Sequence, residues 1–152
     1  AVRALVRSPN HESLLRRTRM PTQQKRVGWI TPGGGLEPGE AALPGLRREL
    51  REETGLRNPK IGPEVWTRRL SFRIERQTWD QHERFFLVEC ERFEPVTDQL
   101  QAVERAYFRG YRWWPIDQIE PSGERFAPRR IGPLLGSLLR DGPPTEPIDA
   151  GP

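Results

Sequence analysis

Short runs of alternating apolar and polar residues fill the first part of the chain and predict β-strands. Ala1–Arg7 and Glu12–Arg17 form two such runs around a turn at residues 8–10. The polar run Met20–Arg26 predicts a loop. Trp29–Thr31 predicts a short extended segment, which ends at a proline followed by three glycines. We therefore expect a small sheet that leads into a glycine-rich turn.

A helical pattern follows the glycines over Ala41–Thr54. Pro44 lies inside this span, so we place it in the first turn, where its missing N–H costs no hydrogen bond. Gly55 provides the C-terminal stop. Apolar side chains at helical spacing predict the buried stripe, which consists of Leu43, Leu46, Leu50 and Thr54.

Two longer segments in the middle of the chain predict a strand pair. They are Glu64–Ile74 and Arg84–Arg92, connected through Glu75–Glu83. The run Phe85–Val88 is apolar on both faces, which is typical of a central strand. The alternation slips near Arg68-Arg69, which predicts a bulge there.

The last third of the chain predicts several short elements. Asp98–Phe108 favours a helix, Tyr111–Trp114 an extended segment and Pro115–Ile119 a helical turn. Leucines at helical spacing predict an amphipathic helix over Pro133–Arg140. Residues 141–152 are rich in proline, and we expect them to form a disordered tail.

Length and composition indicate one loop-rich domain over residues 1–140. The chain has 152 residues, of which 34% are hydrophobic and 16 are prolines. No apolar run reaches membrane-spanning length and no secretory leader is visible, so we expect no membrane partner and a cytoplasmic protein. The single cysteine, Cys90, lies in an apolar run and is expected to be a buried structural thiol, which fits a reducing compartment.

The chain is basic, with a formal net charge of +4, and its cations are mostly arginines. Guanidinium groups suit phosphate oxygens, so the excess is consistent with an anionic substrate. The base composition of the source genome is the favoured explanation of this excess. The arginines are spread along the chain, which makes a dedicated nucleic-acid-binding module less favoured.

Carboxylates crowd onto one side of the predicted helix. Glu49, Glu52 and Glu53 fall at i, i+3 and i+4, and Glu40 precedes them in the loop. Like charges at this spacing repel one another unless a cation lies among them. The pattern therefore indicates a metal site.

These residues resemble a known family motif, the Nudix box. The match runs Gly34-x5-Glu40-x7-Arg48-Glu49-Leu50-x-Glu52-Glu53-x-Gly55-Leu56 and agrees at every defined position. The resemblance implies an α/β (α+β) class protein with the Nudix fold, in which a mixed β-sheet is sandwiched between α-helices. It also implies that the box forms a loop-helix-loop and that the chain is an enzyme acting on phosphoric anhydride bonds.

The resemblance further implies the roles of the box residues. Mg²⁺, or Mn²⁺, would bind Glu49, Glu52 and Glu53, and Arg48 would orient Glu52 as a catalytic support. Glu40 would support the loop, or a metal through a water molecule. Gly34 and Gly35 would bring the main chain close to a phosphate or a metal.

The general base is open at this stage. Glu52 is the first choice because it already belongs to the carboxylate cluster. Glu104 and Glu83 are the alternatives from later segments, each with an ordinary surface charge as the competing interpretation.

The expected substrate is a nucleotide in which a nucleoside diphosphate is linked to a further group X. The downstream proline of ADP-ribose hydrolases and the tyrosine of some dinucleoside polyphosphate hydrolases are absent, which makes those two classes less favoured. A nucleoside triphosphate or a nucleotide sugar stays open. Trp29, Phe72 and Trp79 are candidates for stacking on a nucleobase, although packing explains each of them as well. A non-catalytic nucleotide sensor, an RNA 5′-end pyrophosphohydrolase and a homodimer are the alternatives that the sequence leaves open.

Overall fold

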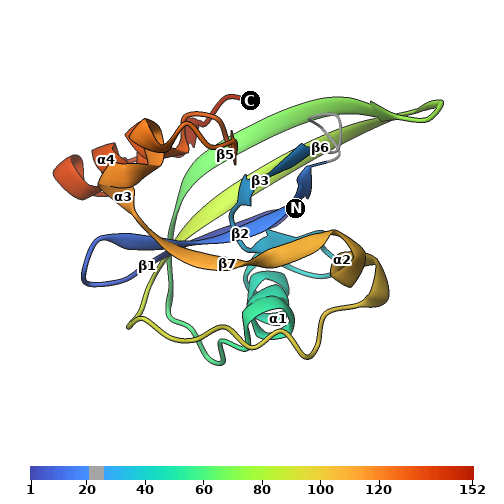
Figure 1. Ribbon diagram of the computed structural model, residues 1–152, viewed down its shortest axis with the longest axis horizontal. Helices are drawn as coiled ribbons and strands as arrows, with labels where there is room; N and C mark the ends of the chain where they lie inside the picture. The colour runs from blue at the N-terminus through green and yellow to red at the C-terminus, as the bar shows by residue number, and fades with distance from the viewer. Residues whose placement is uncertain (21–25) are drawn as a thin grey trace.

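One mixed sheet forms the body of the protein (Figure 1). The computed structural model describes residues 1–20 and 26–152. The strands described there are β1 (Val2–Arg7), β2 (Glu12–Met20), β3 (Arg26–Ile30), β4 (Gly33–Gly34), β5 (Ile61–Ile74), β6 (Gln77–Glu89), β7 (Phe108–Pro115), β8 (Phe126–Ala127) and β9 (Ile148–Asp149). Their order is β8-β3-β2-β1-β6-β5-β9, with β4 also paired to β1 and β7 to β2. The β1–β6, β3–β8 and β5–β9 pairs are parallel and the others antiparallel.

Helices cover both faces of this sheet. They are α1 (Ala42–Thr54), α2 (Ala102–Tyr107), α3 (Ile116–Ile119), the 3-10 turn η2 (Glu120–Ser122) and α4 (Ile131–Asp141). None of the helices in the described part of the chain is long and apolar enough to cross a membrane.

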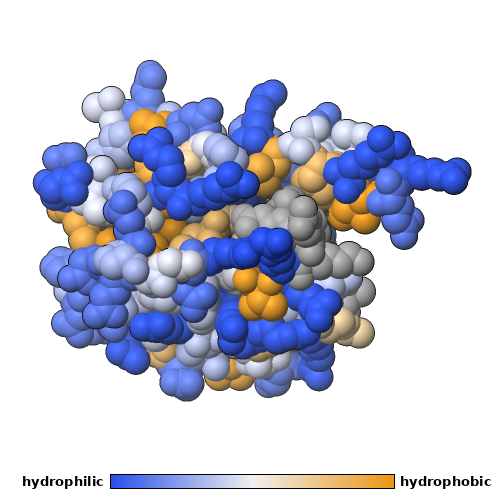
Figure 2. Space-filling model, turned by 45° about the horizontal axis from the view of Figure 1, so that its top comes forward, coloured by the Kyte–Doolittle hydropathy of each residue, from blue (hydrophilic) through white to orange (hydrophobic). Residues whose placement is uncertain are grey.

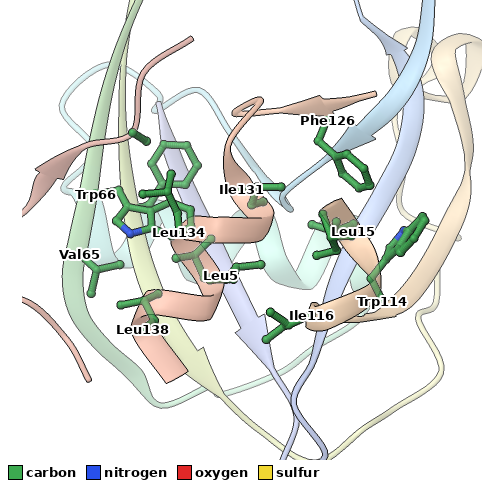
Figure 3. Close-up of a cluster of buried hydrophobic side chains, with 14 of the residues drawn as sticks. Leu5, Leu15, Val65, Trp66, Trp114, Ile116, Phe126, Ile131, Leu134 and Leu138 are labelled. Atoms are coloured by element: carbon green, nitrogen blue, oxygen red, sulfur yellow. The ribbon is translucent and has the colours of Figure 1, made fainter. Parts of the chain in front are cut away.

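The alternation of β1 divides the core into two layers. Val2 and Val6 pack on one side of the sheet in a cluster that includes Leu46 of α1. Leu5 points to the other side and joins a cluster with Leu134 of α4 (Figure 3). Burying each of these leucines contributes about 2 kcal/mol. The sheet thus lies between helices, and the predicted fold class is confirmed.

The strand pair in the middle of the chain is longer than predicted. β5 and β6 stay paired up to Ile74 and Gln77, so a tight turn at Glu75, where φ is +57°, replaces the predicted connection over Glu75–Glu83. The register shifts between Ile61 and Trp66, before the predicted bulge at Arg68-Arg69. Pro63 lies in that interval, and its missing N–H cannot take part in the ladder.

The C-terminal residues are docked, which contradicts the predicted disordered tail over 141–152. β9 pairs with β5, and the Ala150 N–H donates to the Thr67 carbonyl at 2.8 Å. Ala150 is only 1% exposed and belongs to the cluster around α4. A short apolar anchor and a few backbone hydrogen bonds therefore outweigh the proline-rich composition.

Three smaller predictions also differ from the structure or fall outside it. Leu43 is 39% exposed, so the buried side of α1 is turned away from it. Cys90 lies just after β6 and is half-buried. Of the predicted loop Met20–Arg26, residues 21–25 lie outside the described residues, Met20 ends β2 and Arg26 begins β3.

Candidate active site

The glycine turn before α1 is held against β1 at close range. Gly33 pairs with Arg3 and has φ +140°, a conformation that side chains disfavour. A Cβ at Gly33 would lie 2.1 Å from the Val2 carbonyl oxygen. Only glycine fits here, and the close approach directs the Gly33 N–H at the Glu53 carboxylate, 3.0 Å away.

The helix α1 begins and ends as its sequence predicts. Pro44 lies in the first turn, and Gly55 ends the helix in the left-handed conformation at φ +78°. Leu46 and Leu50 anchor the helix to the sheet. In that orientation the carboxylates of Glu49 and Glu53 lie at the edge of the core and face the glycine turn.

Arg48 is the centre of a hydrogen-bonded group that spans the loop and the helix. Its Nε and Nη2 atoms donate to the two oxygens of Glu40, each at 2.8 Å. Nη1 donates to Glu49 at 3.2 Å and to the predicted partner Glu52 at 3.3 Å. Nη2 also donates to the Gly35 carbonyl at 3.1 Å. One guanidinium thereby fixes the loop onto the helix.

This pairing changes the titration of both partners. The hydrogen bonds from Arg48 lower the pKa of Glu40 to about 2. The same hydrogen bonds raise the pKa of Arg48. Glu40 is therefore a fixed anion, and it acts on Arg48 rather than on solvent.

Glu49 lies directly against the second glycine of the turn. A Cβ built on Gly34 would come within 2.7 Å of the Glu49 carboxylate. Glu49 is 8% exposed, and burial raises the pKa of its carboxyl, with Arg48 opposing and Glu52 and Glu104 adding to the rise. Glu52, on the same helix α1, and Glu104, on α2, are thus both within electrostatic reach of Glu49.

Glu53 is the most buried carboxylate of the box. It is 1% exposed and accepts hydrogen bonds from Arg16 Nη1 at 2.7 Å and from the Gly33 N–H. Burial raises the pKa of Glu53 to about 7, although Arg16 and the Gly33 N–H oppose the rise. Glu53 therefore ties α1 to β2 and to the glycine turn.

Two residues that the sequence did not reveal complete this corner. Arg16 lies on β2 and also approaches Glu104 of α2, with 3.9 Å between Nη1 and the carboxylate oxygen. The Tyr111 hydroxyl donates to the main-chain carbonyl of Glu53 at 3.1 Å. Both belong to strands whose pattern gave no sign of a polar contact, and only the pairing of β2 with β7 brings them together.

Glu83 lies in a separate buried ion-pair group. Its two oxygens accept from Arg3 Nε and from Arg68 Nε, each at 2.6 Å. Burial would raise the pKa of Glu83, but the two arginines together lower it. Arg3 also donates to the Gly33 carbonyl at 3.2 Å, so this group adjoins the glycine turn.

The candidate stacking residues occupy different environments. Trp29 is 8% exposed and packs edge-on against Trp114, so its ring belongs to the core. Phe72 and Trp79 face each other across the β5–β6 hairpin, and Trp79 is 49% exposed.

The glycine turn and the carboxylate-bearing helix α1 lie in a segment that matches a known sequence family. Residues 1–135 match the NUDIX domain family, and this span includes every residue of the motif described above. The chain belongs to the NUDIX family. It is accordingly a hydrolase of pyrophosphate bonds.

Individual relatives agree with this assignment. The chain is 29% identical over 133 residues to an RNA pyrophosphohydrolase of Salmonella paratyphi B, with 76% of this chain and 74% of the relative covered. The MutT protein of Methanosarcina mazei has a similar structure, with a TM-score of 0.61, 19% identity and 92% and 94% coverage. An Ap4A hydrolase of C. elegans gives a TM-score of 0.60 at 17% identity, with 91% and 96% coverage. At these identities the two structures show the shared fold.

NUDIX hydrolases generally use divalent metal ions, and the described residues fit such an ion. Gly34 leaves the space that the Glu49 carboxylate occupies, and Glu52 adds a second carboxylate to an all-oxygen donor set. Within residues 1–20 and 26–152, no three acidic, histidine or cysteine side chains converge as a closed metal cage would. A site of two carboxylates completed by substrate phosphates and water suits a hard divalent ion. Glu53 is less available, because Arg16 and Gly33 already bind it.

Proposed function

We propose that this NUDIX hydrolase uses Mg²⁺ or Mn²⁺ to cleave the pyrophosphate bond of a nucleoside diphosphate linked to a further group. The observation that carries the proposal is the Glu49 carboxylate, which lies against Gly34 with Glu52 beside it. Both are held by a single arginine, Arg48. A bound divalent ion would neutralise phosphate oxygens and make a water molecule more nucleophilic.

Arg48 and Glu40 act as positioning residues in this proposal. Glu40 holds the guanidinium in place, and the guanidinium orients Glu49 and Glu52. The main chain at Gly34 and Gly35 then borders the space that a phosphate would enter. Arg48 itself is fully engaged with protein acceptors and is not proposed to touch the substrate.

Glu52 is the proposed general base. It is more exposed than Glu49 and Glu53, so it can accept a proton from a water molecule. Glu104 is the second choice, because it lies within reach of Glu49 and its carboxylate is partly exposed. Glu83 is disfavoured, since both of its oxygens are held by arginines.

The candidate substrates come from the motif and from the named relatives. A nucleoside triphosphate or a nucleotide sugar is consistent with the motif. The 5′ end of RNA is the second candidate, and it is favoured by the relative named an RNA pyrophosphohydrolase together with the basic charge of the chain. We also predict that the protein is cytoplasmic and that it can form a homodimer.

A substrate panel tests the proposal. Nucleoside triphosphates, nucleotide sugars, ADP-ribose, dinucleoside polyphosphates and 5′-triphosphorylated RNA are each incubated with Mg²⁺, with Mn²⁺ and with a chelator, and phosphate release is followed. We expect one class to be cleaved only when the metal is present. Cleavage that is insensitive to the chelator would contradict the metal site, and tight binding of a nucleotide without any cleavage would favour the sensor alternative.

A further inference from the structure

The β5–β6 hairpin projects beyond the rest of the sheet (Figure 1). Residues paired across an antiparallel ladder share one face, and alternate residues change face. One face of the projecting part therefore carries Leu70, Phe72 and Ile74 of β5 opposite Gln81, Trp79 and Gln77 of β6. The other face carries Arg69, Ser71 and Arg73 opposite His82, Asp80 and Thr78. The hairpin is apolar and aromatic on one side and polar on the other.

This apolar face, which we call the aromatic strip, is open to solvent. Trp79 is 49% exposed and Ile74 is 40% exposed. Figure 2 shows apolar surface on the projecting part at the right, among hydrophilic side chains. Large apolar side chains on a protruding element are costly in water and mark a binding surface.

The aromatic strip leads into a cavity that adjoins the glycine turn through Arg3. A cavity of about 170 Å³ is lined by Leu70, Phe72, Arg68 and Arg3 among others. From its wall, Arg3 donates to the Gly33 carbonyl, and the Gly33 N–H donates to Glu53. Two hydrogen bonds thus separate the inner end of the strip from the NUDIX box.

The charge around the strip favours an anion. Residues 68–83 contain four arginines and three carboxylates, and one of these carboxylates, Glu83, is already neutralised by Arg3 and Arg68. Arg76 is exposed at the turn of the hairpin and Arg19 lines the cavity, whereas Arg69 and Arg73 lie on the opposite face. Exposed aromatic rings combined with arginines are the usual means of binding single-stranded nucleic acid.

The length of the strip exceeds a single nucleotide. Arg68 and Ile74 are six residues apart on one strand, which corresponds to about 20 Å. Nucleotides in a helical strand follow one another at about 3.4 Å. A mononucleotide bound at the carboxylates would leave the outer part of the strip uncovered.

We propose that the aromatic strip binds the bases of an RNA strand whose 5′ end lies at the carboxylate site. This inference rests on the proposed hydrolase function and assigns RNA ends as its substrate class. Phe72 and Trp79 stack on bases, and Arg76 and Arg19 contact the phosphates. The strip makes no contact with the reacting phosphates, so it contributes to binding rather than to the chemical step.

The test measures binding of 5′-monophosphorylated oligoadenylates of two and eight nucleotides, labelled at the 3′ end, by fluorescence anisotropy with Mg²⁺. These ligands contain no pyrophosphate bond, so binding is measured without turnover. We expect the longer strand to bind roughly 10-fold more tightly, and Trp79→Ala and Phe72→Ala to lose that gain. Thr78→Ala, on the opposite face of the same hairpin, should retain it.

The outcomes separate this inference from the proposed function. If Trp79→Ala and Phe72→Ala bind both strands as the wild type does, the strip does not bind RNA. A Trp79→Ala variant that changes the oligomeric state but not RNA affinity would make the strip an interface between copies, which also overturns the inference. Length-dependent binding through Trp79 without hydrolysis of any panel substrate would instead contradict the hydrolase proposal and leave the strip as an RNA-binding surface.

Discussion

Arg48 and Glu40 form a two-point ion pair, in which Nε and Nη2 of the guanidinium donate to the two carboxylate oxygens at 2.8 Å each. Glu40 lies in the loop and Arg48 on α1, so the pair joins the two parts of the motif. Its geometry needs a planar fork of donors, which lysine cannot supply. The remaining donors of Arg48 reach Glu49 and Glu52, and the pair therefore positions the proposed metal-binding carboxylates.

Replacing Arg48 should impair catalysis more than folding. We expect Arg48→Ala to lower kcat/KM by about 10- to 100-fold, and Arg48→Lys to recover little of the loss. Glu40→Gln combined with Arg48→Ala should be no worse than Arg48→Ala alone, because the two residues act through one contact. Arg47→Ala, an exposed neighbour on the same helix, serves as the control for steady-state kinetics. Wild-type kinetics in Arg48→Ala would make Arg48 an ordinary surface residue.

A methyl group at Gly34 should displace Glu49. The Cβ would lie within 2.7 Å of the carboxylate, so Gly34→Ala is expected to reduce turnover by about 100-fold while thermal stability changes little. Gly136→Ala in α4 is the control, because a Cβ at that position would meet only the end of the Arg140 side chain, at 3.4 Å. Comparable activity of the two variants would show that the position of Glu49 is not important for turnover.

The local pattern of the sequence was sufficient to predict α1, its proline in the first turn and its glycine stop, because these features depend on neighbouring residues. The contacts around the helix were not predictable in the same way. Arg16 approaches Glu53 only because β2 lies beside the helix, and the orientation that exposes Leu43 is set by the packing of Leu46 and Leu50. Tertiary packing decided these details.

The C-terminal segment and the hairpin illustrate the same limit. Composition favoured disorder after residue 140, but a sheet edge on β5 was available to pair with β9. The segment over residues 75–83 is predicted as a connection because its side chains are mostly polar. In the structure, the hydrogen-bonded pairing of β5 with β6 continues almost to the turn. In both cases the local sequence does not reveal that β5 is the strand with which the segment pairs.

The titration of Glu53 should be visible in the stability of the metal-free protein. Burial raises the folded-state pKa of Glu53 to about 7 from an ordinary 4.5, so the folded protein binds the proton more tightly than the unfolded chain does. Stability is then lost as pH rises from about 4.5 to about 7, by about 3 kcal/mol. Denaturant unfolding at several pH values measures this.

The matching variant is Glu53→Gln, which cannot ionise. Relative to the wild type, its stability should improve as pH rises through that window, and its turnover should be lost while the fold is retained. Parallel pH profiles for the two proteins would mean that Glu53 titrates normally. Near wild-type activity of the variant would remove Glu53 from the site.

Glu83 should prove structural rather than catalytic. In Glu83→Gln the charges of Arg3 and Arg68 stay partly buried without a counter-ion, which should cost about 3 kcal/mol of stability. Glu89→Gln removes an exposed carboxylate that pairs with Arg7, and its cost should stay below about 1 kcal/mol. Thermal denaturation compares the two variants. A stable but inactive Glu83→Gln would restore Glu83 as a candidate base.

The central claim is that Glu49 and Glu52 work with a divalent ion to cleave a pyrophosphate bond. The most direct test is an Mg²⁺ titration of the initial rate on the best panel substrate, for the wild type, Glu49→Gln and the exposed control Glu120→Gln. The account predicts that Glu49→Gln is at least about 100-fold slower and needs more Mg²⁺, while Glu120→Gln follows the wild type. A Glu49→Gln enzyme with the wild-type rate and Mg²⁺ dependence would contradict it.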